Sequence, residues 1–333
     1  MLNTVNLFIA LVVAAITYGT PLLFGTLGEV LTEKSGSLNL GVEGIMFMGG
    51  AIGLGGVFYY EKAVESPSAF LAVLIGLLCA FIAGGIASLI FSFLTITLRA
   101  NQNVTGLALT TFGMGVANFF GVFILNGASY SAAPIANKAF SAKIPVLSGL
   151  GDIGQVVFSY GFLVYAAILL AVVLHWFLTR TRAGLNLRAV GENPATADAA
   201  GINVTLYKYL STCIGAGICG IGGLYYVLDY NQGIWATTGQ IEALGWLAVA
   251  LVIFTTWKPL NAIWGAYLFG MLYWLYQFLP SLLGITMASH ITDLVQMLPY
   301  VVTIIVLIVV SMRKKKENQP PAHLGLAYFR EER

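Results

Sequence analysis

The residues of this chain that could do chemistry in apolar surroundings gather in the segment 28–50, GEVLTEKSGSLNLGVEGIMFMGG. Three carboxylates, one ammonium group and one amide stand there among glycines and apolar residues: Glu29, Glu33, Lys34, Asn39 and Glu43. At membrane depth a broken helix of this kind is tolerated only where it is buried in protein or lines a water-filled cavity. The pattern therefore predicts one broken helix near the N-terminus. The alternative is a loop beside the membrane whose polar groups cap the adjoining helices.

Isolated polar residues also interrupt the apolar regions further along the chain. Asn103 stands near the start of one such region and Asn118 in its interior, while Glu242 and Trp246 stand where a later one begins. An unsatisfied polar group in hydrocarbon costs several kcal/mol, so a buried amide either pairs with a neighbouring helix or faces a cavity. We take these four residues as candidates for lining a path through the protein. Hydrogen bonding between helices is the alternative role for the two asparagines.

Motifs for catalysis and metal binding are missing from the sequence. No lysine follows a glycine, so the phosphate-binding loop GxxxxGK[ST] of ATPases cannot form. The histidines, His175, His290 and His323, are isolated and have none of the spacings of a zinc site. The cysteines lie inside apolar stretches, where packing is their usual role. In the segment 213–223 small residues recur four positions apart, which predicts a tightly packed helix face. We therefore predict no ATP hydrolysis by this chain, no metal and no cofactor, and no basic patch interleaved with aromatic residues suggests nucleic acid.

The composition explains why polar groups are so few. Of 333 residues, 58% are hydrophobic and 9% are charged, which is too apolar for a soluble domain. A membrane crossing needs about 20 apolar residues. Nine regions contain no Asp, Glu, Lys or Arg: 1–28, 44–60, 67–98, 100–137, 153–179, 209–228, 243–257, 259–292 and 294–312. We predict an all-α polytopic membrane bundle of nine or ten spans, in which Pro21 is able to interrupt the first. The N-terminus lacks the charged region of a cleaved signal peptide and is expected to remain as a span.

A long polar stretch, 179–208, separates two of these apolar regions and carries signals for a short helix of its own. Asn193 can cap a helix, Pro194 suits its first position, and Gly201 can take the left-handed conformation that closes it. The alanine-rich residues between them favour helix, which leaves about two turns. Because so short a helix is marginal in water, we expect it to pack against the membrane helices on one side and a protein partner on the other.

Within this stretch the pattern Arg-x-x-Gly-Glu-Asn-Pro-x-x-Ala-x-x-x-Gly-Ile, residues 188–202, resembles the coupling segment of ABC-transporter permeases for simple sugars and nucleosides. The resemblance covers most of the chain. It implies that the ATPase-coupling residues are Arg188, Gly191, Glu192, Asn193, Pro194, Ala197, Asp198 and Gly201. A second motif, Gly-x-Leu-Asn-Leu-Gly-x-Glu-Gly at residues 36–44, lies near the translocation path in that family, which implies that Asn39 and Glu43 face the path.

The resemblance also implies partners and a substrate class. The chain is expected to pair with a second permease, a paralogue or another copy, and to work with ABC ATPase subunits and an extracytoplasmic substrate-binding lipoprotein. The two motifs look more like the branch that imports nucleosides than the ribose-type branch, and simple sugars are the alternative. A secondary transporter or channel is a further alternative, but it would need ionisable residues along the spans to couple ions, and the later spans carry almost none.

The basic residues set the orientation. Twelve of the 16 fall on the side of the stretch 179–208, three (Lys62, Lys138 and Lys143) fall on the other, and Lys34 stays unassigned. The positive-inside rule makes the first side cytoplasmic. We therefore expect a transmembrane domain over 1–312, a cytoplasmic coupling segment at 179–208 and a cytoplasmic tail at 313–333, in the cytoplasmic membrane of a bacterium. The sequence does not determine on which side of the membrane the N-terminus lies, nor the role of the final Arg-Glu-Glu-Arg.

Overall fold

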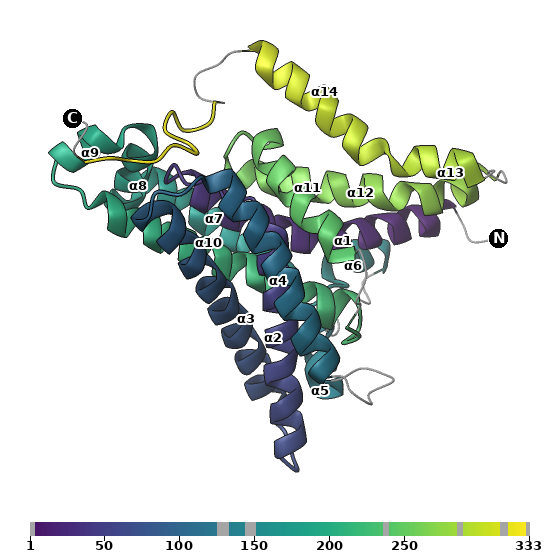
Figure 1. Cartoon of the computed structure of the whole chain (residues 1–333). Coiled ribbons are helices and arrows are strands. Elements are labelled where there is room, and N and C mark those ends of the chain that lie inside the picture. The colour runs from purple at the N-terminus through teal and green to yellow at the C-terminus, as the bar shows by residue number, and fades with distance from the viewer. Residues whose placement is uncertain are drawn as a thin grey trace.

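The computed structural model describes residues 4–124, 133–143, 151–235, 240–284, 289–313 and 319–330, and within these ranges every regular element is a helix (Figure 1). A helix satisfies its own backbone hydrogen bonds, which suits a chain whose long apolar runs meet lipid. The long helices are α1 (Thr4–Glu33), α2 (Val42–Ala63), α3 (Ala69–Ser92), α4 (Gln102–Ile124), α7 (Phe162–Arg180), α10 (Val204–Tyr225), α11 (Gln240–Phe254), α12 (Pro259–Leu283) and α14 (Leu298–Arg313).

Six of these helices are long and apolar enough to cross a membrane: the stretches 5–33, 42–63, 69–97, 102–122, 162–180 and 204–230. Two shorter apolar helical stretches cover 244–254 and 291–306. One long helix occupies most of each charge-free region, so the predicted all-α polytopic membrane bundle is confirmed. The number of spans, nine or ten, stays a prediction.

The predicted break near the N-terminus is observed between α1 and α2, at residues 34–41. Pro21 does not interrupt α1, which runs through it to Glu33. The first helix is therefore longer than its charge-free region, and it carries Glu29 and Glu33 on its last turns. The bundle tolerates this proline because neighbouring helices can re-satisfy the backbone groups it frees.

The core forms where α1, α2, α3 and α10 pack together, with α12 and α11 against α1 and α4 against α2. Small residues let these backbones approach closely, as the sequence 213–223 predicts. A Cβ atom added to Gly49 of α2 would lie 2.3 Å from the Cα of Gly220 in α10. One added to Gly223 would lie 1.8 Å from the carbonyl oxygen of Met46. The predicted packing face of α10 is therefore confirmed.

Short helices complete the structure. They are α5 (Pro134–Phe140), α6 (Gly151–Phe158), α8 (Arg182–Glu192), α9 (Pro194–Ala199) and α13 (Ser289–Gln296). Single π-helical turns extend α3 over Phe93–Thr97 and α10 over Tyr226–Tyr230. Figure 1 shows α8, α9 and the C-terminal tail together at one end of the molecule, far from the turn between α2 and α3. The sequence did not predict α8, so the stretch 179–208 holds two helices rather than one.

Candidate functional site

The helix predicted around Asn193 is present as α9, and its ends have the predicted chemistry. The Asn193 side-chain oxygen accepts a hydrogen bond of 3.0 Å from the backbone N–H of Thr196, and Pro194 occupies the first turn. At the other end Gly201 has φ +82°. The N–H groups of Gly201 and Ile202 donate to the carbonyl oxygens of Asp198 and Ala197, both at 3.0 Å. This pair of bonds is the Schellman closure of a helix, so α9 is capped at both ends although it has only six residues.

The inner face of α9 is packed and its outer face is open. Ala197 and Pro194 are buried, and Ala197 lies in a small apolar cluster with Val190 of α8 and Val204 of α10, against which Tyr328 of the tail packs. On α9 itself the residues between the buried ones are exposed: Ala195, Thr196 and Ala199. The residues Arg188 and Glu192 of α8 and the cap Asn193 are exposed as well. Because the inner face is anchored to two other helices, the exposed face of α9 is held as a rigid surface.

The C-terminal tail braces this corner, a feature that sequence reasoning missed. The Tyr328 hydroxyl donates to Oδ2 of Asp198 at 3.0 Å, and Arg330 Nε donates to the same oxygen at 3.1 Å. Further back, the His323 N–H donates to the carbonyl oxygen of Gly191 at 3.0 Å. The tail therefore ties the end of α8 to α9.

The corner also touches the break between α1 and α2. A Cβ atom on Gly191 would lie 2.3 Å from the carbonyl oxygen of Lys34, so only glycine allows this contact between α8 and the loop 34–41. Burial and the nearby Arg188 guanidinium lower the pKa of Lys34, whereas Glu192 opposes the shift. The N–H of Gly325 in the tail donates to the carbonyl oxygen of Gly36 at 3.2 Å. Both α8 and the tail therefore contact this loop.

Gln102 at the start of α4 joins the same network. Its side-chain oxygen accepts a hydrogen bond of 2.7 Å from the N–H of Leu38, and its side-chain nitrogen donates to the carbonyl oxygen of Leu326 at 3.3 Å. The side chain therefore bridges the loop 34–41, α4 and the tail. The run of amides at residues 101–103 was the available signal, but of these three residues only Asn103, whose side chain is exposed, was predicted to line the path.

Of the six candidate path residues, Asn39 and Glu43 are buried. The Asn39 N–H donates to Glu29 Oε1 at 3.1 Å, and its side-chain oxygen accepts from the N–H of Gly41 at 2.9 Å. The second bond is an Asx turn in the chain just before α2, and the N-cap of α2, Gly41, has no side-chain cap. Glu43 lies in the first turn of α2, packed against Gly245 of α11, where a Cβ atom would lie 2.5 Å from its own Cβ.

The carboxylates of this region are held inside the bundle. Glu29 and Glu33 are 1% and 2% exposed, and Glu43 is 4% exposed. Glu33 accepts a hydrogen bond from the indole Nε1 of Trp257, which lies between α11 and α12. Burial of three carboxylates where α1, α2 and α11 meet is costly without a function or partners.

The other candidates do not gather around them. Asn118 is partly buried on α4, and its side-chain oxygen has no hydrogen-bond partner among the described residues. Trp246 lies on α11 with 44% of its surface exposed. Glu242 lies in α11, but its side chain is outside the described residues. The structure thus brings Asn39 and Glu43 into the interior and leaves Asn103 and Trp246 at the surface of a single chain.

The chain has clear relatives. Residues 11–307 match the family described as the branched-chain amino acid transport system / permease component. The nucleoside ABC transporter permease protein NupC of Lactococcus lactis is 33% identical over 92% of this chain and 93% of its own length. The guanosine ABC transporter permease protein NupQ of Bacillus subtilis is 32% identical over 81% of this chain and 82% of its own.

A third relative points to another substrate. A Haloferax volcanii protein provisionally named as a glucose ABC transporter permease, TsgC13, is 35% identical over 78% of this chain and 74% of its own length. No solved structure matches the chain. The match over nearly the whole sequence and the helical membrane bundle agree, and the chain belongs to the branched-chain amino acid transport system permease family of ABC-transporter permeases.

Proposed function

We propose that this chain is the membrane permease subunit of an ABC importer for nucleosides, driven by separate ATPase subunits that dock on α9. The observation that carries the proposal is the doubly capped α9, whose inner face is anchored to α8 and α10 and whose outer face is exposed. Closure of the ATPases on ATP would push this rigid helix. The contacts of Gly191 and the tail with the loop 34–41 would pass the push to α1 and α2, rocking the spans between two states of access.

The orientation follows from the side on which α9 lies. The segment 179–208 and the described part of the tail, residues 319–330, share one end of the molecule. By sequence, twelve of the 16 basic residues belong to that side. By the positive-inside rule this end, with the C-terminus, is cytoplasmic, and residues 1–312 form the transmembrane domain. The opposite end would receive substrate from a binding lipoprotein in the extracytoplasmic space of a bacterial cell. A second permease, paralogue or copy, would complete the core, because each of two ATPases needs one.

Nucleosides are the proposed substrate because NupC and NupQ carry nucleoside and guanosine transport in their names and align along most of the chain. The name of TsgC13 supports simple sugars as the second candidate. The test is uptake of labelled guanosine into vesicles that contain the full transporter, with unlabelled competitors. We expect nucleosides to suppress uptake and glucose or ribose in hundredfold excess to leave it unchanged. Uptake of labelled glucose that guanosine fails to suppress would assign the chain to sugars.

We also propose that Asn39 and Glu43 act on the translocation path, where buried polar groups near the α1–α2 break would meet a neutral, hydroxylated substrate. Glu43→Gln keeps the shape of the side chain and removes its charge, and Asn39→Leu removes the amide that holds Gly41. A charge at mid-membrane costs roughly 2.5–3.5 kcal/mol. This cost favours a functional role for Glu43 in transport. Both variants should lose most uptake.

The measurement for these variants is initial uptake rate per assembled transporter. Asn103→Leu, at an exposed position on α4, serves as the matched control and should assemble in equal amounts. Normal uptake in both Glu43→Gln and Asn39→Leu would restrict these residues to holding the loop 34–41 in place.

A further inference from the structure

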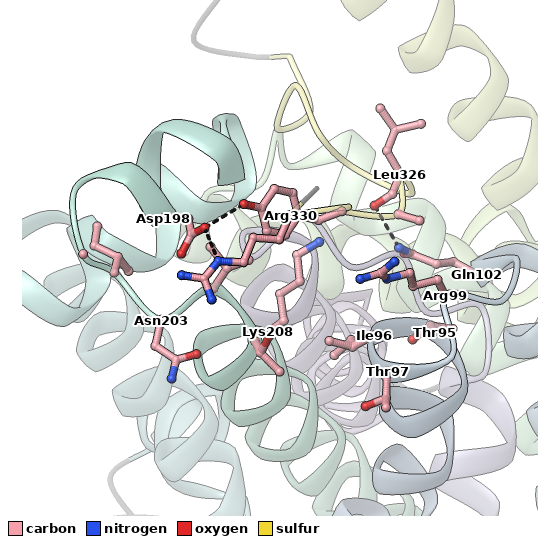
Figure 2. A pocket seen from close by; sticks show the side chains of 16 residues that line it. Thr95, Ile96, Thr97, Arg99, Gln102, Asp198, Asn203, Lys208, Leu326 and Arg330 are labelled. Carbon is pink, nitrogen blue, oxygen red and sulfur yellow. Dashed lines mark hydrogen bonds and ion pairs between the residues drawn. The ribbon is translucent and has the colours of Figure 1, made fainter. Parts of the chain in front are cut away.

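A polar cavity of about 540 Å³ lies between the end of α3, the start of α10 and the C-terminal tail (Figure 2). It is separate from the candidate path, since neither Asn39 nor Glu43 lines it. Its wall carries the hydroxyls of Thr95, Thr97 and Thr205 and the amides of Gln102 and Asn203. The Thr95 hydroxyl already donates to the carbonyl oxygen of Phe91, and one N–H of the Gln102 amide donates to that of Leu326. The Thr205 hydroxyl, the Asn203 amide and the second Gln102 N–H can donate to a ligand, so the cavity suits one that accepts hydrogen bonds.

Lys208 is the central group of this cavity. Its side chain is 4% exposed, and Figure 2 shows it rising from α10 into the space between Arg330 and Arg99. Within the described parts of the chain, its ammonium group makes no hydrogen bond and no ion pair. A buried charge without a partner is strongly unfavourable, so such groups are found paired or bound to a counter-ion. Because Lys208 lines the cavity, its ammonium group can serve as the counter-ion of an anion bound there.

Most of the charged side chains around Lys208 are cationic. Three cationic side chains line the cavity, Arg99, Lys208 and Arg330, against one carboxylate, Asp198. That carboxylate already accepts hydrogen bonds from Tyr328 and Arg330. The Arg99 guanidinium lies over the ring of Phe329, 4.6 Å from its centroid. The wall thus carries an excess of positive charge.

The cavity lies beside the ends of two apolar regions, which favours a membrane lipid as the source of the anion. Arg99 is the first charged residue after the apolar region 67–98, and Lys208 is the last before the apolar region 209–228, so both stand where the spans leave the hydrocarbon. Near them in the sequence, the π-helical turn after α3 and the first turns of α10 expose large apolar side chains: Phe93 (52%), Leu98 (59%), Leu206 (50%) and Leu210 (51%). Acyl chains can cover this apolar surface while a headgroup enters the cavity.

We propose that this cavity binds the phosphate-bearing headgroup of an anionic phospholipid, with Lys208 as its counter-ion and Arg99 beside it at the mouth. Basic pockets between membrane helices are suited to such headgroups. The bound lipid would connect α3, α10 and the tail beside α9, so it would stabilise the corner on which the proposed ATPase acts. Lipid binding itself does not depend on the transported substrate, and its test uses the permease without transport.

The test measures lipid binding to the purified full-length chain in detergent by native mass spectrometry. The probes are phosphatidylglycerol, phosphatidylcholine of the same acyl chains, inorganic phosphate and ADP. We expect one phosphatidylglycerol per chain to bind tightly, phosphatidylcholine to bind weakly, and millimolar phosphate or ADP to leave the bound lipid in place. Lys208→Met keeps the length of the side chain and removes the charge, so it should weaken phosphatidylglycerol binding about tenfold or more, as the loss of a charge-assisted bond does.

Two further variants make the test decisive. Lys62→Met removes an exposed lysine at the end of α2, far from the cavity, and should bind phosphatidylglycerol as the wild type does. Arg99→Gln provides a second change at the site in case Lys208→Met fails to fold, and it should also weaken binding. Equal binding of phosphatidylglycerol by wild type, Lys208→Met and Arg99→Gln would overturn the proposal. Displacement of the lipid by phosphate or ADP would also overturn it, in favour of a soluble anion. A Lys208→Met chain that keeps the lipid but loses its ATPase would overturn it too, because the anion would then be a carboxylate of that partner.

Discussion

Ala197→Pro is expected to abolish nucleoside uptake and the stimulation of ATP hydrolysis by the binding protein, while the permease still inserts and assembles. The N–H of Ala197 donates to the carbonyl oxygen of Asn193 at 3.0 Å, and proline would remove this bond and place its ring against that carbonyl. The cost is about 3 kcal/mol or more, which is large for a helix of six residues that has only a few other backbone bonds, all of them toward its C-terminal end among those between described residues. The preceding Thr196 would also be driven out of the helical conformation.

Two matched variants separate rigidity from other effects of this change. Asn193→Ala removes only the cap at Thr196, which costs about 0.5–2 kcal/mol, so it should reduce uptake and stimulated hydrolysis less than Ala197→Pro does. Ala197→Ser keeps the N–H and nearly the same volume and should behave like the wild type. Substrate delivery by the binding protein happens on the other face and should not change in any of them. Full uptake and full stimulation in Ala197→Pro would reduce α9 to a solvated loop.

The second large effect is expected in the tail. Tyr328→Ala should lower uptake several-fold and expose the tail to protease, because Tyr328 packs against the Val190–Ala197–Val204 cluster and its hydroxyl also bonds Asp198. Without it the tail keeps its bonds to Gly191 and Gln102 and the contact of Phe329 with Arg99, and beside α9 it keeps the ion pair of Arg330, whose side chain is 73% exposed. An exposed ion pair contributes about 0–1 kcal/mol, which is too little to replace the packing of Tyr328 on α9.

Variants of the same tail supply the controls. Tyr328→Phe keeps the packing and loses one hydrogen bond, worth about 0.5–1.5 kcal/mol. Its uptake and protease resistance should therefore lie between those of the wild type and Tyr328→Ala. Arg330→Gln removes only the exposed ion pair and should stay close to wild type in both uptake and protease resistance. If Arg330→Gln lowers uptake and protease resistance more than Tyr328→Ala does, the tail is held by the ion pair rather than by packing on the apolar cluster.

The sequence predicted the features that depend on nearby residues. The α9 helix could be predicted because the cap at Asn193, the first-turn proline and the closing Gly201 lie within nine residues of one another. The long helices could be predicted because charge cannot enter a span cheaply. The packed face of α10 followed from small residues spaced four apart.

Contacts between distant parts of the chain could not be predicted in this way. The tail meets α9 through Tyr328 and Asp198, which are 130 residues apart, and no local pattern indicates that pairing. Gly191 must be glycine because the Lys34 backbone lies against it. The motif shows that a glycine stands at this position, but it does not show which contact requires it. Asn39 could be identified as important, but its bond to Gly41 and the bond of its N–H to Glu29 depend on how α1 ends.

Nucleoside uptake into reconstituted vesicles tests whether ATPase subunits drive transport through this chain. The vesicles contain this chain, its partner permease and the binding protein, and uptake is measured with and without the ATPase subunits. We predict uptake only when the ATPases are present and supplied with ATP on the side of α9, and no uptake driven by a proton or sodium gradient. Uptake that proceeds without the ATPases when such a gradient is imposed would contradict the account and make the chain a secondary transporter.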